Sequence, residues 1–445
     1  MASNGAARRK AKGAGPAARK PSAAPDLLVE NFHVKGSPKR AWPKRIVWWD
    51  ETLRDGEQTP GVYYTLEEKV ELARMISASG VDVMNVGIPA VSPGELKAVK
   101  AIAREGLDAK VLGAARTVRS DIDAVIQSDA SEIATFIAAS EVHLKHKLNL
   151  THEQAIEKAV ESVEYAKEHG LKVTFVTEDT VRAGMDFVTE IYRAAIDAGA
   201  KRVLFCDTVG VMTPSTFGWW LDEMVSRIKR PKVEYGVHIH NDFGMAVANS
   251  LTALEHGIPC VNTTVNGIGE RAGNASFEEL VMALEELYHV DTHIDKQALY
   301  KLSRRVEEIA GVPVAFNKAI VGYNAFTHES GIHTDGVIKN TLTYEPMQVE
   351  TLGRRRRFVF GKHTGTRAVE ARLNEAGLKA SKEQLVAIAN EIKDFTEAHT
   401  KEYVRDFIQA YRQWDRDNKG VSPEVFWSIA GKHGIKVPKP IPVTV

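Results

Sequence analysis

Short apolar segments alternate with longer amphipathic segments between residue 46 and about residue 290. The short segments are rich in β-branched residues, which is typical of buried strands, whereas the longer ones, such as 66–79 and 151–169, carry apolar residues at i, i+3 and i+4. Eight strands are expected, near residues 46–52, 81–88, 110–115, 132–138, 172–178, 202–208, 234–240 and 260–266. This repeat matches a TIM (β/α)8 barrel, and a doubly wound open sheet is the alternative.

After about residue 290 the alternation stops and helical patterns dominate, with amphipathic helices expected over 300–310 and 382–411. Between them, 321–365 is polar and contains glycines. The pattern therefore predicts an α/β protein in which a TIM barrel is followed by a mainly helical C-terminal lid region. Together with the N-terminal segment, this gives three parts. The expected parts are a basic extension (1–45), a catalytic barrel (46–290) and a C-terminal region (291–445).

The composition, with 44% hydrophobic and 26% charged residues, is that of a soluble globular protein. No segment approaches the roughly 18 apolar residues of a membrane helix, and the N-terminus lacks the apolar segment of a signal peptide. A cytoplasmic protein with no membrane partner is expected. Cys206 and Cys260 both lie in apolar strand-like segments, so they are expected to be buried thiols without a disulfide.

The net charge of zero hides an asymmetry, because residues 1–45 carry a net charge of +9 and the remainder carries −9. The extension is rich in Ala, Gly and Pro and is expected to be disordered, since it cannot bury enough apolar surface to offset the entropy of ordering. A transit peptide and a nucleic-acid-binding tail are alternatives to a solvated extension. No aromatic-interleaved basic motif supports nucleic-acid binding, so no nucleic-acid partner is expected.

The segment 237–242 contains His238 and His240, whose side chains point to the same face if the segment is a strand. A lone His-x-His pair is more often ordinary structure than a metal site. Here, however, Asp55 follows the first expected strand, and Asn274 follows the eighth within a glycine-rich segment. This mixed oxygen and nitrogen set suits a divalent ion such as Mn, Co, Mg or Zn.

Further polar residues follow the other expected strands. His143 comes after the fourth, Glu178 after the fifth and Thr208 after the sixth. In a TIM barrel, chemistry occurs at the C-terminal ends of the strands, so these side chains are expected around one site.

The polar segment 321–365 contains His333 and, eleven residues later, Tyr344. These residue types indicate a lid with acid-base groups, although a surface linker is the alternative. The four arginines 354–357 are compatible with phosphate binding and equally with a solvated basic face. No G-x-G-x-x-G or Walker A pattern supports a dehydrogenase or a nucleotide hydrolase.

Three long motifs together resemble the DRE-TIM metallolyase family, in particular its Claisen-condensing branch of homocitrate, isopropylmalate and citramalate synthases. The motifs are DETLRDGEQ (50–58), HIHND (238–242) and NGIGERAGN (266–274). The resemblance covers roughly 46–375 and implies condensation of acetyl-CoA, as co-substrate, with a 2-oxo acid. It also implies a homodimer in which the lid reaches over the partner subunit's barrel.

The family resemblance also implies roles for individual residues. The implied metal ligands are Asp55, His238, His240 and Asn274. The implied catalytic residues are Arg54, Glu178, His333 and Tyr344. The implied substrate contacts are Arg54, Gln58, His143 and Thr208.

The sequence departs from the family at Asn85, where relatives usually carry a glutamate, and it carries Arg182 just after Glu178. One negative charge fewer and one positive charge more at the pocket predict an acidic 2-oxo acid, with Arg182 as a substrate contact. Oxaloacetate, 2-oxoglutarate and the phosphono- or phosphinopyruvate used by similar synthases in antibiotic biosynthesis fit this description. The alternatives are a homocitrate, isopropylmalate or citramalate synthase and a cleavage enzyme like hydroxymethylglutaryl-CoA lyase.

Overall fold

The structure, a computed structural model, describes residues 33, 42–418 and 420–437, so the predicted basic extension lies almost wholly outside the described residues. Eight parallel strands form a closed barrel in the order in which they occur along the chain. Closure is made by β1 and β8, where Val47 pairs with Cys260 and Asp50 pairs with Thr263. The predicted TIM barrel is confirmed. Its strands are β1 (Val47–Asp50), β2 (Val83–Asn85), β3 (Lys110–Arg116), β4 (Glu132–Ala138), β5 (Lys172–Glu178), β6 (Arg202–Asp207), β7 (Glu234–Ile239) and β8 (Cys260–Thr263).

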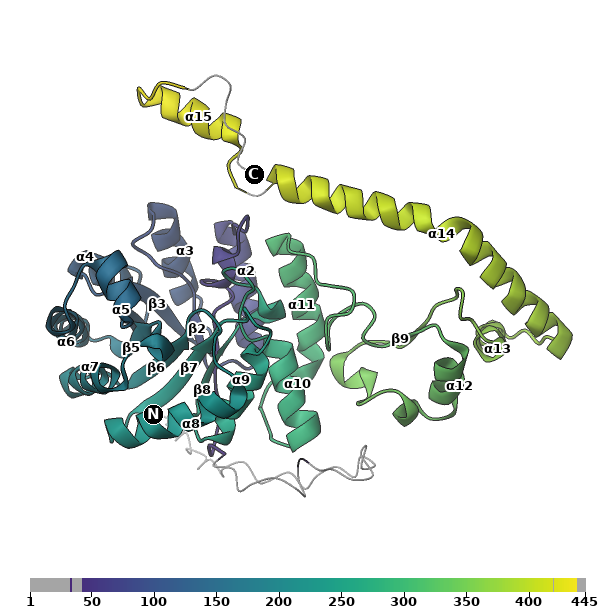
Figure 1. Cartoon of the computed structure of the whole chain (residues 1–445), viewed down its shortest axis with the longest axis horizontal. Helices are drawn as coiled ribbons and strands as arrows, with labels where there is room; N and C mark the ends of the chain where they lie inside the picture. The colour runs from purple at the N-terminus through teal and green to yellow at the C-terminus, as the bar shows by residue number, and fades with distance from the viewer. Residues whose placement is uncertain (1–32, 34–41, 419, 438–445) are drawn as a thin grey trace, which may run out of the picture.

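Helices surround the barrel and connect its consecutive strands (Figure 1). Two of them begin with a capping box. The side chain of Thr65 or Thr151 accepts a hydrogen bond from the backbone N–H three residues later, and the side chain of that later residue accepts one from the backbone N–H of the threonine. The main barrel helices are α2 (Leu66–Ala78), α3 (Pro93–Ala103), α4 (Arg119–Gln127), α6 (His152–Glu168), α7 (Met185–Ala198), α8 (Pro214–Ile228), α9 (Ala246–Glu255) and α10 (Phe277–Tyr288).

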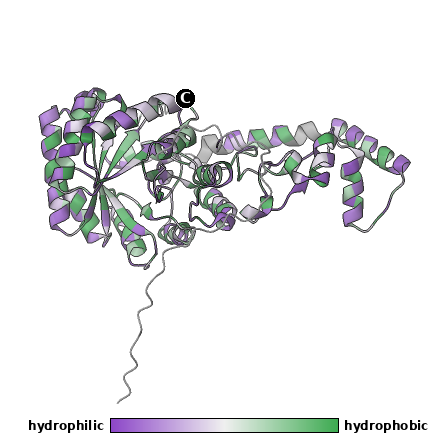
Figure 2. Cartoon of the chain, turned by 90° about the horizontal axis from the view of Figure 1, so that it is seen from below, coloured by the Kyte–Doolittle hydropathy of each residue, from purple (hydrophilic) through white to green (hydrophobic). Residues whose placement is uncertain are grey.

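The barrel has two cores because each strand is covered on both faces. The larger core lies between the sheet and the surrounding helices and includes Trp48, Phe205 and Phe277, all of them fully buried. A smaller cluster that includes Trp49 and Leu204 is formed from alternate positions of the strands. In Figure 2 the strands at the centre of the barrel are mostly hydrophobic, while the outer helices carry many hydrophilic residues.

The C-terminal region is mainly helical, as predicted, and extends away from the barrel (Figures 1 and 2). Helix α11 packs on α2 and adds Leu299, Leu302 and Val306 to the larger core. The segment predicted to be polar contains two short parallel strands around α12. The elements are α11 (Lys296–Ala310), β9 (Thr327–His328), α12 (Gly331–Lys339), β10 (Arg357–Phe358), α13 (Thr366–Glu375), α14 (Lys382–Asn418) and α15 (Pro423–Lys432).

Helices α13 and α14 share a small cluster in which Val369, Leu385 and Ala389 are buried. Cys206 and Cys260 are free and buried in the barrel, as predicted. Within the described part of the chain, no helix is both long enough and apolar enough to cross a bilayer.

Candidate metal and active site

A cavity of about 300 Å³ opens at the C-terminal ends of the barrel strands. Its apolar residues come mostly from the strands, and its polar residues come from the C-terminal parts of the strands and from the loops that follow them. The apolar residues are Trp49, Ile88, Ala114, Ala134, Phe136, Val176, Leu204 and Cys206. The polar residues are Glu51, Arg54, Asp55, Gln58, Asn85, Lys147, Glu178, Thr208, His238, His240, Asn262, Glu270 and Arg271.

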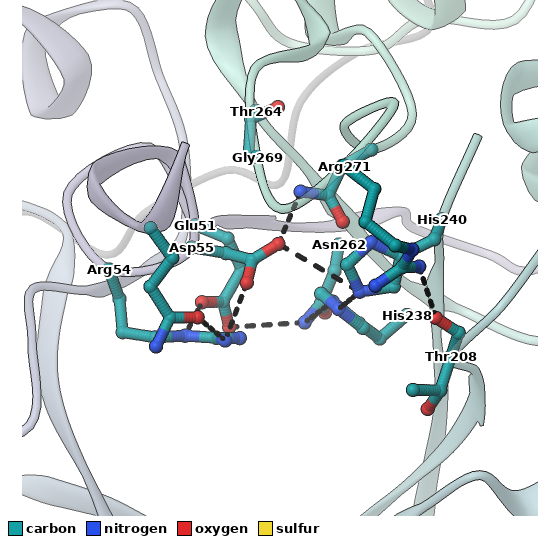
Figure 3. Close-up of polar contacts among 12 residues, drawn as sticks. Glu51, Arg54, Asp55, Thr208, His238, His240, Asn262, Thr264, Gly269 and Arg271 are labelled. Atoms are coloured by element: carbon teal, nitrogen blue, oxygen red, sulfur yellow. Dashed lines mark hydrogen bonds and ion pairs between the residues drawn. The ribbon is translucent and has the colours of Figure 1, made fainter. Parts of the chain in front are cut away.

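Asp55, His238 and His240 form a buried cluster at one side of this cavity (Figure 3). One ligand atom from each of the three residues lies within 4.8 Å of the other two. The Nε2 atoms of His238 and His240 are 3.1 Å apart, and His240 Nε2 is 3.9 Å from an Asp55 carboxylate oxygen. Asn274 joins the cluster by donating from its side-chain amide to Asp55. The structure thus brings together all four residues predicted to bind the metal.

The chemistry of this cluster fits a divalent cation. Burial, together with the neighbouring His240, lowers the pKa of His238 to about 3, and burial lowers the pKa of His240 as well, so both imidazoles are neutral and keep a lone pair. Burial alone would raise the pKa of Asp55, but Arg54 and the two histidines lower it to about 2, so the carboxylate is ionised. The side-chain oxygen of Asn274 is buried and has no hydrogen-bond partner among the described residues. Two neutral imidazoles, a carboxylate and an unpartnered amide oxygen are suitable metal ligands.

The loop after β8 sets the position of Asn274 through a glycine. Gly269 has a φ of +157°, and a Cβ atom at this position would lie 2.1 Å from Asn274 Nδ2 and 3.0 Å from an Asp55 carboxylate oxygen. Only a residue without a side chain allows the loop to approach the cluster this closely.

Arg54 lies beside the metal cluster and is held by two carboxylates. Its Nε donates to Glu51 at 2.6 Å, and its Nη1 donates to Asp55 at 3.0 Å (Figure 3). Gln58 is exposed on the cavity rim, with its side-chain oxygen 3.5 Å from Arg54 Nη1. The guanidinium is therefore fixed in orientation and faces the cavity together with Asp55.

Glu51 is a fully buried carboxylate to which several side chains donate. Besides Arg54, the donors are Trp49 Nε1 at 2.7 Å, Asn85 Nδ2 at 3.1 Å and Asn262 Nδ2 at 3.3 Å. Burial raises the pKa of Glu51, although Arg54 opposes this shift. The side-chain oxygens of Asn85 and Asn262 are buried and accept no hydrogen bond within the part of the chain that the structure describes. Both residues line the cavity and offer acceptors there.

Glu178 lies at the end of β5 and forms an ion pair with Lys147. Lys147 Nζ donates to both carboxylate oxygens of Glu178, at 2.7 and 2.8 Å. Lys147 comes from the π-helical turn Leu144–Leu148 that follows β4. His143 does not line the cavity, but its Nδ1 lies 3.6 Å from a Glu178 carboxylate oxygen. This nitrogen is buried, and no described residue forms a hydrogen bond with it.

Arg182 and Thr208 are placed differently relative to the cavity. Thr208 lines it, and its hydroxyl accepts from the backbone N–H of Asp179 at 2.8 Å. The Arg182 guanidinium instead pairs with Asp179, which precedes it by one helical turn, and Arg182 is not among the residues that line the cavity. Asp179 thus holds the Arg182 guanidinium, although Arg182 follows Glu178 closely in sequence.

His333 and Tyr344 lie in the C-terminal region, outside the barrel cavity of the same chain. Their rings contact each other, with centroids 4.3 Å apart, and both residues are exposed. Figure 1 shows α12, which carries His333, well separated from the barrel strands. A single chain thus brings most of the predicted barrel residues to one cavity, with His143 and Arg182 outside its lining, but it does not bring the two predicted lid residues there.

A second cavity, of about 1240 Å³, lies among α12, β10 and α13, away from the metal cluster. Its lining includes the four arginines 354–357, for which phosphate binding and a solvated face were the alternatives. Arg354 fits neither, because it is buried and donates to the carbonyls of Ile320 and Gly322. Arg356 forms an ion pair with Glu345. The barrel cavity, which holds the titratable cluster, is the better candidate for chemistry.

Several functional candidates were missed in the sequence. Glu51, Asn262 and Arg271 line the cavity, and Arg271 pairs with Asp242 and donates to the carbonyl of Thr208. Lys147 was also missed, although it lies one helical turn after His143. The signal for it was the negative charge of Glu178, which needs a nearby cation to balance it.

The fold and the site define a class of protein, a (β/α)8 barrel with a buried Asp-His-His cluster at the C-terminal ends of its strands. Residues 45–306, more than half of the chain, match the family described as HMGL-like, and residues 320–400 match the homocitrate synthase post-HMGL domain-like family. The chain therefore belongs to the HMGL-like family. Together with the relatives, these matches confirm the resemblance to the Claisen-condensing branch of the DRE-TIM metallolyases.

Three curated relatives, all from Methanopyrus kandleri, carry different synthase names. A probable 2-isopropylmalate synthase is 51% identical over 79% of this chain and 70% of its own length. A homocitrate synthase, AksA, is 46% identical over 85% of this chain and 96% of its own length. A putative (R)-citramalate synthase is 45% identical over 88% of this chain and 77% of its own length. The names agree on the family and differ in substrate.

Solved structures of hydroxymethylglutaryl-CoA lyases share the fold. The Bacillus subtilis enzyme superposes with a TM-score of 0.57 at 20% identity, over 63% of this chain and 98% of its own. The Pseudomonas aeruginosa enzyme gives a TM-score of 0.56 at 24% identity, over 64% and 97%. At this level of identity the likeness supports the barrel fold alone.

Proposed function

We propose that this protein condenses acetyl-CoA with an acidic 2-oxo acid to give a malate-type 2-hydroxy acid and free CoA. The observation that carries the proposal is the arrangement in one cavity of the Asp55, His238 and His240 cluster, the fixed Arg54 guanidinium and the Glu178 carboxylate. The synthase names of the relatives support the same reaction class.

Asp55, His238 and His240 would hold a divalent metal, and Asn274 would hold or orient it. Mn, Co, Mg and Zn all suit this ligand set. When bound, such an ion supplies positive charge to the carboxylate and ketone oxygens of a 2-oxo acid and so polarises the carbonyl.

The chain's own residues account for the remaining steps. A base removes a proton from the acetyl methyl group, and the resulting carbanion attacks the ketone carbon to form the new carbon-carbon bond. The ketone oxygen becomes an alkoxide, and Arg54 stabilises this developing negative charge. After the alkoxide is protonated, water cleaves the thioester and releases CoA. Gln58 and Thr208 contact the substrate from the rim of the cavity.

The proposed acid-base groups are Glu178, His333 and Tyr344, with His143 placed to contact Glu178. Because His333 and Tyr344 lie outside the cavity of their own chain, they would act on the barrel of a second copy. This arrangement requires a homodimer. Exposed apolar side chains on α14, such as Phe395 and Val404, support an association that covers this helix.

Asn85 supports the acidic substrate, since it lines the cavity as a neutral residue. The contribution expected from Arg182 is not supported by its position. Homocitrate, isopropylmalate and citramalate synthase activities are the specific alternatives, since relatives carry each of these names.

The test assays several 2-oxo acids in parallel with acetyl-CoA and follows released CoA by thiol titration. We expect release to require both substrates, to be faster with oxaloacetate or 2-oxoglutarate than with 2-oxoisovalerate, and to stop when a chelator removes the metal. Absence of CoA release with every 2-oxo acid in metal-replete protein would contradict the proposed reaction.

A further inference from the structure

Lys147 is a cation in the barrel cavity that has no role in the proposed chemistry. It lines the cavity, and its side chain is 52% exposed. Its side-chain contacts in the described part of the chain engage only Glu178. An ammonium group has three N–H donors, and the two carboxylate oxygens of Glu178 account for two of them. One donor is therefore left for a ligand in the cavity.

The topology places Lys147 across the cavity from the metal cluster. The cluster is built on β7 and on the loops after β1, β7 and β8, and these three strands are neighbours in the closed barrel. Lys147 follows β4 and Glu178 ends β5, and these strands lie on the opposite side of an eight-stranded ring. A molecule held at the cluster by one end thus extends toward Lys147.

The cavity wall on the side of Lys147 is apolar. Ala134 and Phe136 come from β4, Val176 comes from β5, and Leu204 comes from β6. This wall suits a short chain of methylene groups, which gains from burial against apolar surface.

The other cations that line the cavity are already engaged. Arg54 donates to Glu51 and Asp55, both of them buried. Arg271 pairs with Asp242 and donates to the Thr208 carbonyl. Among the residues that line the cavity, Lys147 is thus the cation best able to take an additional anionic partner.

We propose that Lys147 is the residue that selects an acidic substrate, by binding the terminal acid group of a 2-oxo acid whose other end lies at the Asp55, His238 and His240 cluster. The inference rests on the proposed function and adds the residue that binds the second acid group of the substrate. Glu178 keeps its place because Lys147 can bind both carboxylates at once through different N–H groups.

The test compares Lys147→Met with Lys147→Arg, and Lys145→Met serves as the matched control. Lys145 lies in the same turn, is exposed and does not line the cavity. For Lys147→Met we expect the Michaelis constant for oxaloacetate or 2-oxoglutarate to rise about tenfold to a hundredfold, the scale of one lost charged hydrogen bond. The loss should be smaller for a monocarboxylic 2-oxo acid, which has no terminal acid group for Lys147 to bind. It should appear in the Michaelis constant for the 2-oxo acid and not in that for acetyl-CoA. Lys147→Arg should restore most of the loss, and Lys145→Met should resemble the wild type.

Other results would overturn the assignment. An equal loss on acidic and neutral 2-oxo acids would show that Lys147 only positions Glu178. A raised Michaelis constant for acetyl-CoA would place Lys147 at the thioester, and unchanged kinetics would remove it from the site. If the wild type turns over no 2-oxo acid, the proposed function fails. Calorimetric titration of metal-loaded wild type and Lys147→Met with 2-oxoglutarate then tests the anion site separately, and equal affinities or no binding would refute it.

Discussion

In the barrel, large side chains such as Trp48, Phe205 and Phe277 are fully buried, whereas on α14 Phe395 is 63% and Val404 is 61% exposed. The barrel core runs continuously through the strands and the surrounding helices. Among the described residues, the cluster between α13 and α14 buries only Val369, Leu385 and Ala389. The barrel core is therefore large enough to stabilise the barrel and to hold charged groups in place, whereas the described residues of α13 and α14 bury little apolar surface of their own.

The same contrast applies to the proposed chemistry. Groups in the barrel, such as Asp55 and Glu178, are fixed by ion pairs with Arg54 and Lys147. His333 and Tyr344 contact each other and are exposed. The barrel therefore has a formed site, whereas the C-terminal region presents groups that need a second surface to act on.

The largest expected effect is loss of the metal cluster. Replacing His240 by Ala removes a buried ligand, so metal affinity should fall at least about tenfold and turnover should be lost, since even residues that only support ligands contribute this much. Metal content by mass spectrometry and CoA release measure the two effects. Full activity of exhaustively chelated wild type would show that no metal is needed.

The second prediction places one catalytic group in each region. Glu178→Gln and His333→Ala should each lower kcat and kcat/KM together by about 10²–10⁴-fold, because proton transfer matters mainly in the transition state. Tyr344→Phe should act in the same direction. Lys339→Ala is the control, because Lys339 lies on the same helix as His333 and its ion pair in the described part of the chain is with Asp335.

Mixing the two inactive variants tests whether the regions meet between subunits. If the lid acts on the partner barrel, half of the randomly mixed dimers contain one intact site, and about a quarter of the wild-type activity returns. If no activity returns after the subunits have exchanged, the lid acts within its own chain or has no catalytic role.

The third prediction concerns stability. Phe205 makes ring contacts with Tyr192 and Trp220 at centroid distances of 5.3 and 5.2 Å, so Phe205→Ala should cost about 3–5 kcal/mol of unfolding free energy. Leu385→Ala should cost about 2 kcal/mol, at the low end for buried leucines, because the small α13–α14 cluster can collapse around the gap. Urea denaturation followed by circular dichroism compares them, and equal losses would contradict the contrast between the two regions.

The smallest expected effect is on substrate preference. In Asn85→Glu a carboxylate replaces the amide that donates to Glu51, which should repel an acidic substrate. One charge a few ångströms away contributes about 4 kcal/mol at an effective dielectric near 20 before desolvation, and half of that is more than tenfold in kcat/KM. Asn85→Gln controls for size, and melting temperatures control for repulsion from Glu51. Equal activity of Asn85→Glu on acidic and aliphatic 2-oxo acids would refute the charge argument.

The sequence predicted the barrel well because period and length are local signals. The strand expected near 234–240 is Glu234–Ile239, and the helix expected over 151–169 is His152–Glu168. Asp55, His238, His240 and Asn274 were predicted to meet because parallel strands gather their C-terminal ends on one side. These predictions needed no knowledge of individual contacts.

The positions of Arg182 and Lys147 could not be predicted from the sequence, because they depend on which nearby carboxylate each side chain pairs with. Arg182 is adjacent to the site in sequence, but Asp179 three residues earlier binds it. Lys147 lies nine residues beyond the end of β4, and only the π-helical turn brings it to Glu178. Such choices between nearby charges depend on rotamers and loop geometry, which periodicity does not encode.

Gly269 shows how a position without a side chain can limit the ways in which such a site can change. A methyl group there would collide with Asn274 and crowd Asp55, which come from opposite ends of the barrel sequence. Directed evolution of new metal or substrate preferences would therefore find this position closed to single substitutions. A larger residue at 269 becomes acceptable only after the loop after β8 and the turn after β1 have moved apart, so these two segments are expected to accept change together or not at all.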